Sequence, residues 1–198
     1  MKYIRQLYDW VLKWAESPYG ALALFILAFA ESSFFPIPPD VLLIALVLGS
    51  QTKAFRFALI ATAGSVLGGL FGYYIGYALW NIGVDQFFFA HIPGFTYELF
   101  ESVKLQYNEW GFWIVFTAGF TPIPYKVFTI ASGVVELNLL MFLIASTVSR
   151  AARFFLVSTL LWKFGAPIKT FIDKYFNILA IAFTVLLIGG FVLIKYLI

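Results

Sequence analysis

The sequence predicts an all-α polytopic membrane protein: an inverted repeat of two re-entrant helical hairpins, each followed by a transmembrane helix. Of its 198 residues, 62% are hydrophobic and only 12% are charged, whereas soluble domains are about half apolar and about a quarter charged. The apolar stretches are interrupted twice by the tripeptide Pro-Ile-Pro, at residues 36–38 and 122–124. The same order of elements surrounds both interruptions. We therefore expect residues 1–198 to form a single membrane domain.

Residues 1–17 are predicted to form an amphipathic helix that lies in the membrane interface. Apolar side chains such as Leu7 and Val11 share one helical stripe, and charged ones such as Arg5 and Lys13 occupy the rest. No cleavable signal pattern precedes the first apolar run. We therefore expect the first hydrophobic segment to remain in the mature protein.

Residues 19–81 form the first predicted repeat. A helix that spans a bilayer needs about 20 consecutive apolar residues, and neither side of the first Pro-Ile-Pro offers that length comfortably. Proline cannot continue a helix, because it lacks the amide proton and clashes with the preceding turn. We therefore predict a hairpin that returns to the side it entered from, followed by a full crossing over residues 55–81. The prolines expected to break the two hairpins are Pro36, Pro38, Pro39, Pro122 and Pro124.

The predicted crossing carries glycine at every fourth position, at Gly64, Gly68, Gly72 and Gly76. Small residues at this spacing let membrane helices approach closely. The expected role is helix packing, either against a hairpin or against a second copy of the chain. A groove along which a lipid slides is the alternative.

Residues 110–164 form the second predicted repeat, after an external loop with a surface helix over residues 82–109. Aligning the two Pro-Ile-Pro tripeptides pairs Asp40 with Lys126. A re-entrant hairpin adds no crossing and the next helix adds one, so the second repeat starts on the opposite side, as in many transporters. Residues 165–198 are predicted to form a basic linker and a final transmembrane helix.

The distribution of lysine and arginine predicts the orientation. With three crossings, the basic residues of the N-terminus and of the 165–198 linker lie on one side of the membrane. The loop at residues 82–109, which carries a net acidic charge, lies on the other side. By the positive-inside rule, the N-terminus is expected in the cytoplasm and the C-terminus outside.

Charged residues at membrane depth are the candidates for function, because each costs roughly 2.5–3.5 kcal/mol to insert. They are Glu31, Asp40, Lys126, Arg150 and Arg153. If the hairpins meet tip to tip, Asp40 and Lys126 are expected to be neighbours, with the two arginines sharing one helix face. The three cations and Thr121 would bind an anionic headgroup such as a phosphate. Glu31 or Asp40 would carry a coupling proton. The alternative is a set of internal salt bridges that only join the two hairpins.

Several classes of function are excluded by the sequence. There is no cysteine and only one histidine, His91, so a thiolate or histidine metal cluster cannot form. Glycine-rich phosphate loops and Gly-x-Ser-x-Gly elbows are absent, and the basic residues are too dispersed for nucleic acid. We expect neither an enzyme nor a bound cofactor or metal.

Three segments together resemble the DedA family, also called SNARE-associated or VTT-domain membrane proteins. They are residues 31–40, the glycine run at 64–76, and residues 119–126, whose Thr-Pro-Ile-Pro-Tyr-Lys stretch is most similar to the YqaA-type branch. The resemblance implies a bacterial inner-membrane protein that moves lipids between leaflets, undecaprenyl phosphate among them, with dependence on the proton-motive force. It implies that Glu31 and Asp40 are the acidic positions of the first hairpin. Lys126 stands where the second hairpin often carries an arginine after its proline.

The family's other arginine, before that proline, is replaced here by a neutral residue near Thr121. Arg150 or Arg153 is the expected substitute. The function expected is thus a flippase for an anionic lipid or a polyprenyl-phosphate carrier, coupled to protons and acting alone or as a homo-oligomer. Two alternatives stay open: a proton-coupled transporter of a small soluble ion or solute, and a lipid-binding scaffold that transports nothing.

Overall fold

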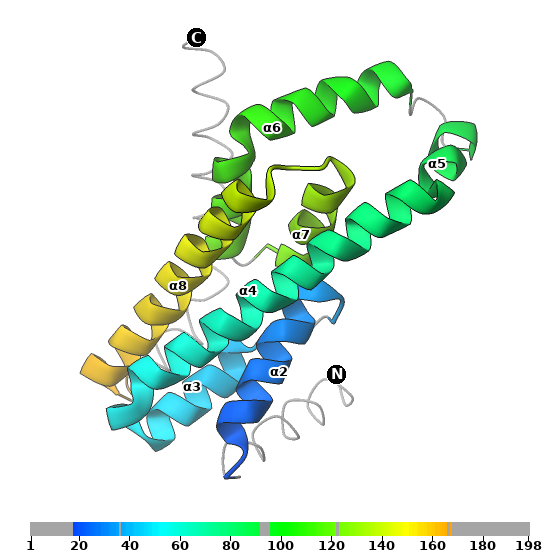
Figure 1. Ribbon diagram of the computed structural model, residues 1–198. Coiled ribbons are helices and arrows are strands. Elements are labelled where there is room, and N and C mark those ends of the chain that lie inside the picture. The colour runs from blue at the N-terminus through cyan, green and yellow to red at the C-terminus, as the bar shows by residue number, and fades with distance from the viewer. Residues whose placement is uncertain (1–17, 36, 92–95, 122, 166, 168–198) are drawn as a thin grey trace, which may run out of the picture.

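The computed structural model describes residues 18–35, 37–91, 96–121, 123–165 and 167. Within these ranges every regular element is a helix, which confirms the all-α class. The elements are α2 (Gly20–Ser33), α3 (Asp40–Gly49), η1 (Gln51–Lys53), α4 (Ala54–Leu79), η2 (Trp80–Val84), α5 (Asp85–His91), α6 (Tyr97–Phe120), α7 (Tyr125–Val134) and α8 (Leu139–Phe164) (Figure 1). The predicted amphipathic helix, the final transmembrane helix and the prolines Pro36 and Pro122 lie outside the described residues.

Two helical stretches are long and apolar enough to cross a bilayer, by length and composition: Gln51–His91, which contains α4, and Leu139–Phe164, which is α8. Each of α4 and α8 has 26 residues, or about 39 Å at the usual rise, and a hydrocarbon core is about 30 Å thick. Both correspond to predicted crossings. The two α-helices before α4 are short, with 14 residues in α2 and 10 in α3.

Helices α2 and α7 follow α4 in the same direction, one after the other. Gly64 of α4 faces the backbone of Phe25 in α2, and Gly76 faces the backbone of Ile130 in α7. Where α2 ends and α7 begins, the Thr129 hydroxyl donates to the Ser32 carbonyl at 2.9 Å. The two short helices together therefore accompany α4 along most of its length (Figure 1).

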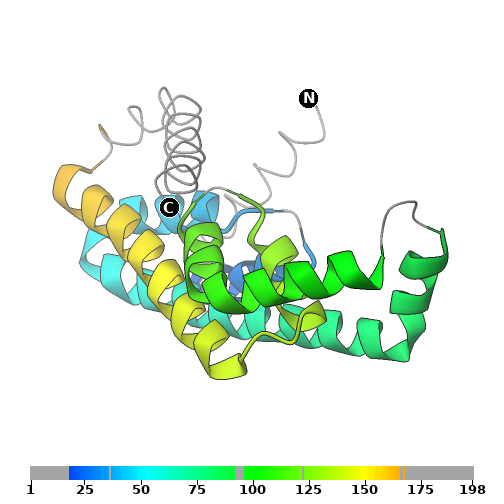
Figure 2. The same ribbon diagram turned by 90° about the horizontal axis from the view of Figure 1, so that it is seen from above.

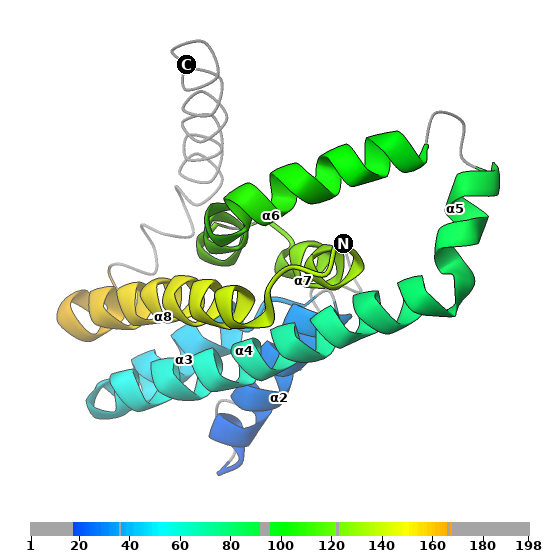
Figure 3. The ribbon, with the colours of Figure 1, turned by 45° about the horizontal axis from the view of Figure 1, so that its top comes forward.

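Helices α6 and α3 accompany α8 in the same manner. Gly119, near the end of α6, faces Ser149 of α8, and Asp40, which begins α3, contacts Arg153 one turn further along. In the described ranges, α4 and α8 are thus each flanked by two helices that come from different halves of the sequence (Figure 3).

The second half differs from the prediction in one respect. An external loop with a surface helix was expected up to residue 109, and a separate hairpin arm from residue 110, whereas a single helix, α6, runs without a break from Tyr97 to Phe120. Thr96 caps its start by accepting from the Leu99 amide at 3.2 Å. No proline lies between 97 and 120, so nothing stops the polar surface segment from continuing into the apolar one. Figure 2 shows α6 crossing above α7.

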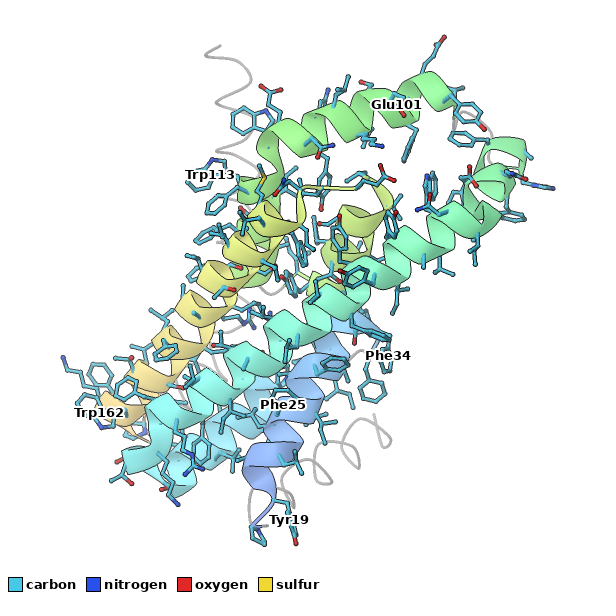
Figure 4. All side chains as sticks on the ribbon, viewed as in Figure 1. Tyr19, Phe25, Phe34, Glu101, Trp113 and Trp162 are labelled. Carbon is cyan, nitrogen blue, oxygen red and sulfur yellow. The ribbon has the colours of Figure 1, made fainter. Side chains whose placement is uncertain are left out.

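Large aromatic side chains point away from the bundle. Trp113 on α6 and Trp162 on α8 project outward, as does Phe34 at the end of α2 (Figure 4), and all three are more than half exposed or close to it. A soluble protein seldom exposes so many large apolar groups, whereas lipid tails solvate them. The outer surface is therefore typical of a membrane protein.

Candidate functional site at the junction of the hairpins

Two separate apolar cores leave a polar layer between them. One core joins α2, α3 and the first half of α4 to the end of α8. The other joins the second half of α4 to α6, α7 and the start of α8. The buried polar residues at this level are Ser32, Ser33, Ser65, Thr121, Thr129, Ser146, Ser149 and Arg150. Ser33 and Thr121, which precede the two predicted breaks in the sequence, belong to this layer.

Asp40 pairs with Arg153 through both of its oxygens. Nε of Arg153 lies 3.2 Å from Oδ1 and Nη2 lies 3.0 Å from Oδ2. The third arm of the guanidinium, Nη1, donates to the Phe120 carbonyl at 3.3 Å. The two side chains are only 20% and 15% exposed. A bidentate ion pair of this kind fixes both the distance and the orientation of the partners.

The neighbour expected for Asp40 was Lys126, and that expectation is wrong. Asp40 begins α3, which packs along α8, whereas Lys126 lies in the first turn of α7, which packs along α4. The acid therefore faces the arginines of α8. Lys126 is partly buried and forms no salt bridge to any residue that the structure describes.

Glu31 pairs with Arg150 through one oxygen. Nη2 of Arg150 lies 2.8 Å from Oε2 of Glu31, and the arginine side chain is 3% exposed. Nε donates to the Ser65 hydroxyl at 2.5 Å, and Nη1 to the Gly119 carbonyl at 3.4 Å. The guanidinium also lies over the rings of Tyr125 and Phe154, at 4.9 and 4.7 Å from their centroids.

Thr121 combines burial with an unused hydroxyl. The residue is 2% exposed, and its Oγ1 has no hydrogen-bond partner among the described residues, a property shared only with Ser158 in that part of the chain. Thr121 follows Phe120, the residue whose carbonyl accepts from Arg153. A buried hydroxyl without a partner costs free energy. A ligand atom bound beside the ion pair would give the Thr121 hydroxyl a hydrogen-bond partner.

The four glycines of α4 face helices of the same chain. An added methyl group would overlap the backbone of α2 at Gly64 and Gly68, and that of α7 at Gly76, while at Gly72 it would meet Thr129. This face of α4 is therefore filled, and no groove runs along it in this arrangement.

Sequence reasoning missed the hydroxyl contacts between helices. Ser32 and Ser65 lie 2.6 Å apart, and the Tyr125 hydroxyl donates to Ser146 at 2.5 Å. Hydroxyls in helices commonly bond to a carbonyl of their own preceding turn, as Ser33 and Thr62 do. The one available signal was that Ser65 adjoins Gly64 in the glycine run, where another backbone comes close.

Metal binding has no support in the described ranges, where no group of three or more His, Cys, Asp or Glu residues could hold an ion.

Comparison with known proteins places the chain. The VTT domain matches residues 37–163. The chain belongs to the VTT-domain, or DedA, family. An uncharacterized protein of Haemophilus influenzae is 37% identical over 87% of this chain and 90% of its own length. Undecaprenyl phosphate transporter A of Staphylococcus aureus is 28% identical over 75% of this chain and 71% of its own length. No solved structure matches. This VTT-domain chain is accordingly a membrane protein of a transporter-type family and not an enzyme.

Proposed function

We propose that this VTT-domain protein moves a phosphate-bearing lipid between the two leaflets, with the junction of the hairpins as its headgroup site. The observation that carries the proposal is the excess of positive charge there. Three cations, Lys126, Arg150 and Arg153, accompany two carboxylates, and Lys126 has no ion-pair partner in the described ranges. An unpaired cation at membrane depth is costly unless it has an anionic ligand. The name of the Staphylococcus aureus relative, an undecaprenyl phosphate transporter, favours a polyprenyl phosphate among such lipids.

The proposed membrane arrangement is an inverted repeat of two re-entrant hairpins, α2–α3 and α6–α7. Support comes from the matching contacts of the two halves: α2 packs on α4 as α6 packs on α8, and α7 packs on α4 as α3 packs on α8. Irregular backbone at membrane depth is tolerated where protein or water covers it. The N-terminus is proposed to be cytoplasmic and the C-terminus outside, in the inner membrane of a bacterium.

The proposed mechanism exchanges one anion for another on an arginine. A phosphate offers the guanidinium the same fork of oxygens as a carboxylate. When a proton from water binds Glu31 or Asp40, that acid becomes neutral, and its arginine is free to bind the headgroup while Lys126 adds charge and Thr121 a hydrogen bond. Loss of the proton on the other side restores the ion pair and releases the lipid. Lipid movement is thereby coupled to protons.

The test uses purified protein in liposomes that contain a fluorescently labelled phosphatidylglycerol, or a labelled polyprenyl phosphate, with quenching of the outer leaflet. The wild type is expected to move the label between leaflets, and Lys126→Ala and Asp40→Asn to reduce the rate at least tenfold. Lys53→Ala, which removes an exposed cation at the start of α4, is the matched control and should leave the rate unchanged.

Each other outcome contradicts part of the proposal. Unchanged movement in both site variants would refute the site assignment. Uptake of a small solute without lipid movement would favour a solute transporter. Variants that lose stability while even the wild type transports nothing would mean that the ion pairs serve a lipid-binding scaffold.

A further inference from the structure

Glu31, Arg150 and two serines form a closed ring of hydrogen bonds. Arg150 donates from Nη2 to Oε2 of Glu31 at 2.8 Å and from Nε to Ser65 at 2.5 Å. The Ser65 and Ser32 hydroxyls lie 2.6 Å apart, and Ser32 donates to the same Oε2 at 3.2 Å. Both serines are fully buried. The ring therefore links α2, α4 and α8 inside the polar layer.

The direction of every hydrogen bond in the ring is determined. Ser65 accepts from Nε of Arg150, and Ser32 gives its single hydrogen to Glu31. The hydrogen between the serines must therefore come from Ser65, since a hydroxyl has only one to donate. Ser65 thus serves as the acceptor that occupies Nε of the arginine.

Because Ser65 accepts a hydrogen bond from Nε of Arg150, the two arginines bind their carboxylates in different geometries. Arg153 directs Nε and Nη2 to the two oxygens of Asp40. Arg150 directs only Nη2 to Glu31, and Oε1 of Glu31 forms no hydrogen bond with any described residue. A carboxylate held through both oxygens must lose a bond to take a proton, whereas Oε1 of Glu31 can take one without first losing a bond.

We propose that Ser65 is a positioning residue that keeps Nε of Arg150 away from Glu31. Glu31 is then the acid that takes up the transported proton, while Asp40 stays ionised and bound to Arg153. This inference rests on the proton-coupled function proposed above and assigns its proton to one residue. After the proton binds Oε1, the bonds of Arg150 to Ser65 and Gly119 hold the guanidinium in place, and Nη2 is free for a phosphate oxygen.

The charged and titratable groups around Glu31 come from three helices. Arg150 of α8 pairs with it, and Arg153 of α8 and Tyr125 of α7 are near enough to interact with it electrostatically. Asp40 of α3 shares the field of Arg150. Of these, only Arg150 contacts Glu31 directly, so its orientation has the largest influence on the carboxylate.

The test measures the protonation of Glu31 directly, by infrared titration of the purified protein in detergent. The carboxylic acid band of Glu31 is identified as the one that disappears in Glu31→Gln. In Ser65→Ala, Nε loses its acceptor and turns to Oε1, forming a fork like that of Arg153. The midpoint should then move to lower pH by about one pH unit. In Ser32→Ala the carboxylate loses a donor, so the midpoint should move to higher pH.

Two controls distinguish the proposed role from general packing. Ser65→Thr keeps the hydroxyl and should restore the wild-type midpoint. Thr62→Val removes a hydroxyl one turn away that bonds only to the Ala58 carbonyl of its own helix, and it should have no effect. A midpoint that does not move in Ser65→Ala, or that moves upward, would overturn the proposal. If Ser65→Ala does not fold, the upward shift in Ser32→Ala decides in its place.

The same variants separate this inference from the proposed function. Shifts of opposite sign in a protein that moves no lipid in liposomes would leave the serine ring intact and refute the transport proposal. If both Ser65→Ala and Ser32→Ala moved lipid with the pH dependence of the wild type, the proposed role of Ser65 would be refuted and the transport proposal would stand.

Discussion

At the scale of single residues, one acceptor accounts for the difference between two similar ion pairs. Asp40–Arg153 and Glu31–Arg150 both join an acid of the first half to an arginine of α8. Breaking a buried pair by removing one partner is strongly destabilising, typically by about 3–5 kcal/mol. Both pairs therefore hold the two halves together while also standing beside the proposed headgroup site. Structural and functional roles coincide here, and mutation of the charges alone does not separate them.

Thr121 offers a residue whose function can be separated from stability. Thr121→Val removes a buried hydroxyl that has no partner within the described ranges, so thermal unfolding in detergent should be unchanged or shifted slightly upward. If a headgroup oxygen accepts from this hydroxyl, lipid movement in liposomes should fall severalfold, and Thr121→Ser should restore it.

Ser158→Ala is the matched control for Thr121→Val. Its hydroxyl is also buried and unpartnered in the described part of the chain, but it lies about two turns beyond Arg150 on α8. We expect lipid movement to be unaffected. An equal loss of transport in both variants, or no loss in Thr121→Val, would remove Thr121 from the proposed site.

At the scale of helices, the close contact of α2 with α4 positions the serines. Gly68→Ala would overlap the Phe29 backbone, so α2 must move away and Ser32 must separate from Ser65. We expect the apparent melting temperature in detergent to fall by several degrees and the midpoint of Glu31 to change. Gly49→Ala in α3 meets no atom within 4 Å and should be neutral or slightly stabilising, because alanine favours helix over glycine. Equal effects of the two substitutions would contradict this account.

The helices were largely predictable from the sequence, and their partners were not. Hydropathy and length predicted the segments that became α4 and α8, and the prolines indicated where the short helices end. The extent of α6 was wrong, because no local signal separates its polar part from its apolar part. The pairing of Asp40 with Arg153 depends on which side of α3 faces α8, a tertiary property that no pattern in one sequence encodes. The charged residues Glu31, Asp40, Arg150 and Arg153 were predicted as candidates and the serines of the polar layer were not; the roles of all of them stay predictions.

At the scale of the whole molecule, the topology can be tested on a chain that has no cysteine of its own. Single cysteines replace the exposed residues Tyr19 and Gln51, at the two ends of the first hairpin, and Glu109 and Glu136, which flank the second. In intact cells and inverted vesicles, a membrane-impermeant maleimide should label the first pair only from the cytoplasmic side. It should label the second pair only from outside.

The control and the contrary result follow from the same experiment. Denatured samples should label at all four positions, which shows that each cysteine is reactive. If α2 and α3 each crossed the membrane in full, Tyr19→Cys and Gln51→Cys would still label from one side, but a cysteine in place of the exposed Phe34 between them would label from outside. That result would replace the re-entrant topology with ordinary crossings.

The separation in sequence between the paired charges has a consequence for biosynthesis. Glu31 and Asp40 precede their arginines by 119 and 113 residues. At about 5–20 residues per second, the ribosome reaches Arg150 roughly 6–24 seconds after Glu31. Throughout that interval two carboxylates lack their cations, and stable burial of the hairpin in lipid would be expensive. The first hairpin should therefore reach its final depth in the membrane only after α8 has been inserted, so a helix made later completes the burial of one made earlier.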